Sequence, residues 1–291
     1  MEAGIDVICD KPMTTTPEDA ADLVEAAREY NRFFGVTYTY SFHSMIRQAR
    51  AMVAGGAIGA VRQAHVEYVQ DWATGAMDPD TKQAGWRRNP KHTGRTSVTA
   101  DIGTHAFHLL SFVLDQPINE LSARFHVCGG ADNLEDTAFM QLKIGPQDIP
   151  GTLWCTQAAA GNACGLRFRI YGDEGGLEWD QEFPEQLHYT PIKQPTRTLF
   201  RGKGADILPE AERLIRLPRG HSEGVSDAWC NLYTEMAAAI DARRTGVNLP
   251  NGLIQVPDVV DGARGVFFAD AAADSHEDNG AWKLCWFEEE V

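Results

Sequence analysis

Residues 4–12 read G-I-D-V-I-C-D-K-P, and this stretch decides the fold. A short apolar run that ends at a charged pair is typical of a buried strand in a parallel sheet. A helix is predicted next, because Thr16 suits the N-cap and Pro17 the first helical position. Residues 33–40, F-F-G-V-T-Y-T-Y, then predict a second short strand. The segment therefore predicts one β–α–β unit of a parallel sheet.

The rest of the chain predicts a larger α+β region in which strands dominate after residue 120. The strands alternate in polarity, as an open and mostly antiparallel sheet with one covered face does. The fold class is therefore an α/β segment followed by an α+β domain. The predicted helices are 44–54, 101–114, 226–244 and 256–274; the predicted strands are 61–72, 121–128, 137–144, 150–157, 165–171 and 176–180; residues 191–222 are predicted as loop.

Composition narrows the class of partner. The chain has 291 residues, 43% hydrophobic content and a net charge of −15, so two domains and a soluble cytoplasmic protein are expected. Such an acidic chain is a poor binder of nucleic acid or of an anionic membrane, and no apolar run approaches the ~20 residues that span a bilayer. Its six cysteines show no zinc spacing. These properties favour a small-molecule substrate.

Asp101, His105 and His108 stand at i, i+4 and i+7, so a helix would place them on one side. Three interpretations stay open at this point. The three can be buried polar groups that hydrogen-bond locally, a metal site of two histidines and a carboxylate, or a proton-transfer pair. In the third case Asp101 would favour the imidazolium of His105 and raise its pKa.

Other candidate residues stand at strand ends and in loops. Lys11 ends an apolar strand, where ligands bind in open α/β sheets, and it could stabilise charge on a substrate oxygen. Trp86 and Arg87 could stack on a ring or hold an anion. His221, in G-H-S-E-G, could reach a substrate. For each of them, a surface or packing role is the simpler interpretation.

Five motifs, taken in order along the chain, resemble the Gfo/Idh/MocA oxidoreductase family. C-D-K-P resembles the E-K-P motif of the family, and D-I-G-T-H-A-F-H resembles its D-x-G-x-H helix. No single motif is decisive, but the ordered set is specific and spans nearly the whole chain. The five matching segments are residues 9–12, 36–50, 85–90, 101–108 and 261–272.

The resemblance implies an NAD(P)-linked enzyme that moves a hydride to or from a carbinol carbon of a sugar, inositol or related polyol, without a metal. By position, Lys11 would bind the reacting oxygen and His105 would be the general acid/base. Asp101 would be the partner of His105 and a substrate ligand. The remaining assignments are Asp10 beside the nicotinamide ribose, Trp86 and Arg87 at the nicotinamide end, and His108 as a further substrate contact whose polarity differs from that of relatives.

The resemblance also implies the domain organisation: residues 1–40 as the C-terminal remnant of a Rossmann domain, 41–255 as the substrate and oligomerisation domain, and 256–291 as a helix and tail that pack back on the first. The family's G-x-G-x-x-G/A turn, which holds the pyrophosphate, has no match before Gly4. We therefore expect that a polypeptide of these 291 residues binds NAD(P) weakly or not at all, which isothermal titration would test.

Two explanations of the absent turn remain. The sequence can be an incomplete oxidoreductase, which the intact Lys11, Asp101 and His105 set favours. Alternatively, it can be a non-catalytic protein that keeps the sheet as an oligomerisation surface. A metal-dependent sugar isomerase or lyase is a third possibility. By analogy with the family, a homodimer or homotetramer is expected.

Overall fold

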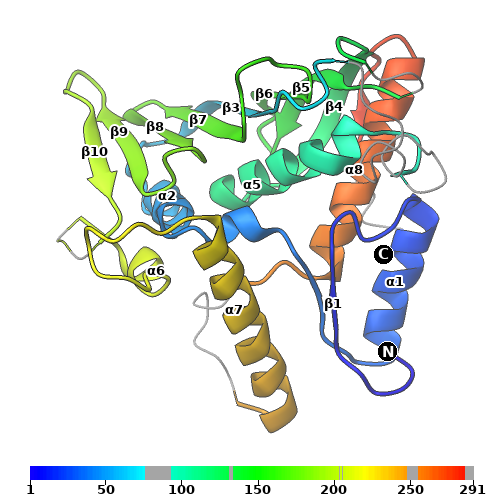
Figure 1. Ribbon diagram of the computed structural model, residues 1–291, viewed down its shortest axis with the longest axis horizontal. Helices are drawn as coiled ribbons and strands as arrows, with labels where there is room; N and C mark the ends of the chain where they lie inside the picture. The colour runs from blue at the N-terminus through cyan, green and yellow to red at the C-terminus, as the bar shows by residue number, and fades with distance from the viewer. Residues whose placement is uncertain (76–92, 131–133, 203, 205, 248–254, 286–291) are drawn as a thin grey trace.

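The computed structural model describes residues 1–75, 93–130, 134–202, 204, 206–247 and 255–285. A large, open sheet lies over a layer of helices, and a small α/β unit stands to one side of it (Figure 1). The long helix α8 (Val259–Glu277) runs between the two. Among the described residues, no helix is both long and apolar enough to span a membrane.

The small unit is the predicted β–α–β segment. Strands β1 (Val7–Cys9) and β2 (Phe34–Val36) pair in parallel, and α1 (Pro17–Glu29) connects them. The helix begins as predicted: the Oγ1 of Thr16 accepts a hydrogen bond from the backbone N–H of Asp19. Because the strands are parallel, their carboxyl ends lie at the same edge of the sheet.

The large sheet has nine strands in the order β10-β9-β8-β7-β3-β6-β5-β4-β11. Every neighbouring pair is antiparallel except β3 and β6, which confirms the mostly antiparallel sheet. The strands are β3 (Val61–Val69), β4 (Ile118–His126), β5 (Thr137–Ile144), β6 (Ile149–Thr156), β7 (Gly165–Gly172), β8 (Gly175–Asp180), β9 (Gln186–Pro191), β10 (Arg197–Phe200) and β11 (Lys283–Leu284).

Helices cover one face of this sheet and complete its core. A five-residue π-helical turn, Thr99–Gly103, leads directly into α5 (Thr104–Leu114). This composite helix packs with α2 (Ser44–Ala54) and α8 beneath the strands (Figure 1). Fully buried side chains from each layer meet there, such as Ile46, Leu109, Leu153 and Phe268. The core thus fixes the position of the π-helical turn.

Two further helices lie below the outer strands. Helix α6 (Pro209–Glu212) packs on α2, and α7 (Val225–Thr245) packs on a 3-10 turn at Thr39–Phe42. The prediction of loop throughout 191–222 was wrong, because β10 and α6 lie inside it and β9 ends in it. The predicted strand 33–40 is shorter than expected, since β2 ends at Val36 and the chain turns at Thr39.

Candidate active site

Lys11 and Asp101 come from different parts of the fold and meet in an ion pair. Lys11 lies two residues beyond β1, and its side chain is only 12% exposed. Its Nζ lies 3.3 Å from Oδ1 of Asp101 and also donates to the backbone carbonyl of Asp101. The prediction that these two residues share a site is therefore supported by a direct contact.

A second donor orients the Asp101 carboxylate. Gln157, which follows β6, donates from Nε2 to Oδ2 of Asp101 at 2.7 Å. The two carboxylate oxygens thus have different partners, an ammonium on one side and an amide on the other. No sequence pattern pointed to Gln157, since only the sheet topology brings the end of β6 to the π-helical turn.

Glu135 holds the start of that π-helical turn. Its carboxylate is buried and accepts the backbone N–H groups of Ser97 at 2.9 Å and Thr99 at 3.0 Å. Burial raises the pKa of Glu135 to about 7, and these N–H groups act against that rise. Segments of π-helix are rare and are frequently found at functional sites. Glu135 therefore fixes the backbone that carries Asp101.

Asp10 ties together the ends of the two parallel strands. Its Oδ1 accepts from Oγ1 of Thr37 at 2.5 Å and from the backbone N–H of Lys11 at 2.9 Å. Thr37 follows β2, so one carboxylate bridges both strand ends. The contact of Asp10 with a nicotinamide ribose stays a prediction.

His105 lies one helical turn after Asp101, enclosed by aromatic rings. The rings of Tyr38 and Tyr40 approach it edge-on, with centroids 5.9 and 4.9 Å away, and Tyr68 lies at 6.3 Å. Its Nδ1 is buried and has no hydrogen-bond partner in the described part of the chain. Burial, and then the charge of Lys11, hold the pKa of His105 well below its ordinary value. His105 is therefore a neutral imidazole.

The prediction that Asp101 raises the pKa of His105 was wrong. The spacing i, i+4 suggested a carboxylate beside the ring. In the structure the carboxylate is engaged by Lys11 and Gln157, so the imidazole loses water without gaining a partner charge of opposite sign. The neutral form is the one that can accept a proton.

A cluster of hydroxyl and thiol groups lies behind His105. The hydroxyls of Tyr40 and Tyr68 are 2.5 Å apart, and Sγ of Cys164 lies 3.4 Å from the Tyr68 hydroxyl. Burial raises the pKa of both tyrosines, so both remain protonated. The ring of Tyr38 contacts the imidazoles of His105 and His108 and also belongs to the buried cluster of the small unit, with Val36 and Val266.

The structure does not bring His108 to Lys11 and Asp101. Its ring stacks on Tyr38 with centroids 4.2 Å apart, whereas Tyr38 presents an edge to His105. Burial lowers the pKa of His108 to about 3. In the described residues no group of three histidines, cysteines or carboxylates could hold a metal. The metal-site interpretation of residues 101, 105 and 108 therefore has no geometric support.

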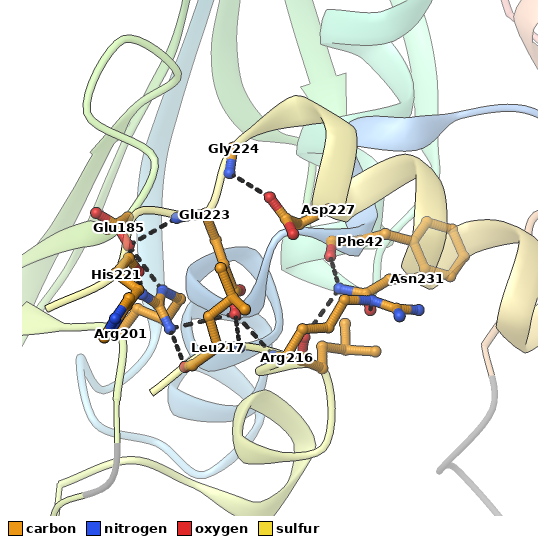
Figure 2. A network of polar contacts seen from close by, with 11 residues as sticks. Phe42, Glu185, Arg201, Arg216, Leu217, His221, Glu223, Gly224, Asp227 and Asn231 are labelled. Carbon is orange, nitrogen blue, oxygen red and sulfur yellow. Dashed lines mark hydrogen bonds and ion pairs between the residues drawn. The ribbon is translucent and has the colours of Figure 1, made fainter. Parts of the chain in front are cut away.

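His221 is also absent from this cluster. It is exposed in the loop before α7, where its carbonyl oxygen accepts a hydrogen bond from Arg201 (Figure 2). Arg201 is 4% exposed and binds Glu185 and Glu223, so the loop belongs to a separate polar network. Trp86 and Arg87 lie outside the described residues. The substrate or cofactor contacts predicted for these residues and His108 stay predictions.

The assembled groups suit carbinol–carbonyl chemistry beside a nicotinamide. An ammonium held by a carboxylate can bind an oxygen, and a neutral imidazole can exchange the proton of that oxygen. The strand ends that carry Asp10 and Lys11 are the edge where open α/β sheets bind nucleotides. The residues present therefore fit the nicotinamide end of NAD(P), with Asp10, Lys11 and Thr37 on that edge.

Comparisons with known proteins identify the two parts of the fold. The family model "Oxidoreductase family, NAD-binding Rossmann fold" matches residues 1–38, and the model "GFO/IDH/MocA C-terminal domain" matches residues 46–178. The boundary between the two models falls next to the 3-10 turn that links the small unit to α2.

Relatives cover almost all of the chain. The oxidoreductase YfiI of Bacillus subtilis, itself uncharacterised, is 32% identical over 97% of this chain and 72% of its own length. An oxidoreductase from Sinorhizobium meliloti has a TM-score of 0.83 and 40% identity, over 97% of this chain and 73% of that one. An inositol dehydrogenase homologue of Azotobacter vinelandii, solved with NADH and myo-inositol, has a TM-score of 0.87 and 33% identity, over 97% and 72%. The chain belongs to the GFO/IDH/MocA family of NAD(P)-dependent oxidoreductases.

Proposed function

We propose that the chain transfers a hydride between NAD(P) and a carbinol carbon of a sugar, inositol or related polyol. The observation that carries the proposal is the ion pair of Lys11 with Asp101 on the same helical segment as a neutral, enclosed His105. The relative from Azotobacter vinelandii, solved with NADH and myo-inositol, supports this class of substrate.

In the direction of oxidation, each residue has one task. The ammonium of Lys11 donates a hydrogen bond to the reacting oxygen and stabilises the negative charge that develops there. The neutral imidazole of His105 accepts the proton of that oxygen. Asp101, fixed by Gln157, positions Lys11 and also faces the substrate. When bound, the oxidised nicotinamide supplies the acceptor for the hydride.

Hydride transfer to NAD+ and NADP+ by the purified protein, measured with a panel of inositols and monosaccharides at high cofactor concentration because weak cofactor binding is expected, tests the proposal. We expect turnover with at least one neutral polyol and none without a nicotinamide cofactor. Metal analysis of the same sample is the matched measurement. If no polyol is oxidised and stoichiometric zinc or manganese is found, the isomerase or lyase interpretation replaces this one.

We also propose a homodimer or homotetramer that forms through the uncovered face of the large sheet. Phe139 on that face is 49% exposed and stacks on Trp154, with centroids 5.8 Å apart. A cavity of about 490 Å³ opens beside them, lined by residues of five neighbouring strands, including Ser122 and Arg169. Apolar surface rimmed by polar groups is typical of subunit contacts. Light scattering after gel filtration tests this, and a monomer at micromolar concentration would contradict it.

A further inference from the structure

A cavity of about 710 Å³ lies behind the catalytic helix, on the other side of Tyr38 from His105. Its walls come from α2, α5, the segment 255–257 and the first turns of α8. A volume in this range is typical of small-molecule sites. Lys11 and Asp101 are not among its lining residues, so it is distinct from the active site.

Two polar side chains of α5 line this cavity, and neither has a hydrogen-bond partner among the residues that the structure describes. His108 is 8% exposed and lies between Tyr38 and Phe112, and its ring makes no hydrogen bond to the described part of the chain. The Oγ of Ser111 is also buried without a partner there. Leaving a buried polar group unpaired costs about 1–3 kcal/mol, and the Ser111 hydroxyl is such a group, so a bound partner is expected beside it.

The charges around the cavity are balanced. Arg50 pairs with Asp115 at 2.8 Å, and Arg264 lies 3.8 Å from Asp261. Among the lining residues, two cations and two carboxylates leave no net charge. They do offer donors and acceptors side by side, which hydroxyl groups can satisfy because each hydroxyl both donates and accepts.

Aromatic surface completes the lining. Phe107 and Phe112 face the cavity together with His108, and the guanidinium of Arg50 lies over Phe112 at 4.6 Å from the ring centroid. Flat apolar faces next to paired polar groups suit a ring that is apolar on its C–H face and polar at its edge.

We propose that this cavity is a second, non-catalytic binding site for a neutral polyhydroxylated ring, a monosaccharide or cyclitol. His108 and Ser111 hydrogen-bond its hydroxyls, and the two ion pairs hold the opposite edge. The proposal depends on the lining of this cavity alone, so it stands whether or not the chain oxidises the same ligand. Because Tyr38 lies between the two imidazoles, a ligand here changes the environment of His108 more than that of His105.

Histidine-labelled protein distinguishes the two sites by NMR. The ring resonances are assigned with His105→Gln and His108→Gln, and myo-inositol, D-xylose and inorganic phosphate are titrated separately. We expect a saturable shift of the His108 resonance with a neutral polyol and none with phosphate. A response to phosphate alone, or shifts of His105 alone, would overturn the proposal.

Filling the cavity is the second arm of the test. Ser111→Leu should abolish the shift of His108 while any shift of His105 persists, and Ser226→Leu, on the exposed side of α7, is the matched control that should change neither. Arg264→Met changes a side chain that is 43% exposed, so it removes one polar group of the cavity wall with little risk to folding. It should raise the polyol concentration that half-saturates the His108 shift at least tenfold. Retention of the full His108 response in both folded variants contradicts a ligand in this cavity.

Discussion

The small α/β unit and the large sheet contribute to one site in different ways. Each strand of the small unit has only three residues, and the residues of β1 are partly exposed. This unit nevertheless supplies Lys11 and Asp10. The large sheet and the helices that cover it share a continuous buried core, and they supply Asp101, His105 and Gln157. The ammonium of Lys11 thus comes from the small, less enclosed unit. The groups that orient this ammonium come from the large region with its continuous core.

Helix α8 joins the two regions through close contacts at glycines. A Cβ at Gly262 would lie 2.7 Å from a methyl of Val36, and one at Gly265 would lie 2.1 Å from the hydroxyl of Tyr38. Only glycine allows such an approach. The position of Lys11 relative to Asp101 therefore depends on how closely α8 packs against β2 and the residues that follow it.

The largest expected effect on the reaction rate follows from removing the imidazole of His105. His105→Ala should lower kcat by about 10²- to 10⁴-fold, the usual contribution of a general acid or base. Initial rates of hydride transfer measure it. His126→Ala, at an exposed histidine of β4, is the control and should leave the rate unchanged. Equal rates for His105→Ala and the unmodified protein would remove His105 from the reaction.

The pH dependence of the same reaction follows from the neutral state of His105. A protonated imidazole cannot accept a proton, so kcat/KM for oxidation falls as the pH decreases through the pKa of His105. Burial and Lys11 lower that pKa well below the ordinary value of 6.5. The acidic limb of the profile should therefore lie below pH 6.5. A limb above that value would show that Asp101 controls the ring after all.

The next largest effect is expected from removing the ammonium of Lys11, the cation that the small unit supplies. Lys11→Met keeps an unbranched side chain that lacks only the terminal ammonium, and kcat should fall by about 10²- to 10³-fold, as when one oxyanion donor is lost. The stability should change less than the rate, because the partner Asp101 keeps Gln157. Thermal unfolding separates the two effects. A loss of stability that accounts for the lost activity would make Lys11 a structural residue.

Local patterns were sufficient to predict much of the large sheet and its helices. Residues 44–54 were predicted as a helix and form α2 with those bounds, since Gly55 follows directly, and residues 137–144 likewise form β5. Strand β10 and helix α6 were missed because residues 191–222 are rich in proline and arginine, a composition that suggested a loop but also occurs at sheet edges. Edge strands therefore looked like loop.

The identity of the site residues was predictable, but their pairing was not. Helical spacing placed Asp101 near His105, yet the true partners of the carboxylate are 90 residues before it and 56 residues after it. No periodicity encodes such contacts, because the sheet topology creates them. The π-helical turn has no sequence signature either, so the orientations of Asp101 and His108 became visible only with the fold.

A smaller effect is expected where α8 meets the small unit. Gly265→Ala places a methyl group against the rigid ring of Tyr38, and overpacking of this kind costs about 1–3 kcal/mol, partly offset by the better helix propensity of alanine. Denaturant unfolding measures it. Gly75→Ala is the control, since its added Cβ meets none of the described residues within 4 Å. Equal stability of both variants would mean that Tyr38 moves freely and that α8 does not set the distance between the two regions.

The smallest effect concerns an ion pair that ties α7 to the start of β1. Arg244 is 64% exposed and its Nη2 lies 3.0 Å from Oδ2 of Asp6, so Arg244→Ala should lower the free energy of unfolding by only about 0.5 kcal/mol.

The pH dependence of this ion pair follows from the pKa of Asp6. Burial acts to raise this pKa, but the N–H of Phe33 and then Arg244 bring it below 3.8. This contribution is therefore present above pH 3.8 and is lost as the pH falls through the lowered pKa. Unfolding at pH 7 and at pH 3, with Arg62→Ala as the matched surface pair on the large sheet, tests the sign. A cost for Arg244→Ala that grows toward acid would show that the small unit is held by something other than this pair.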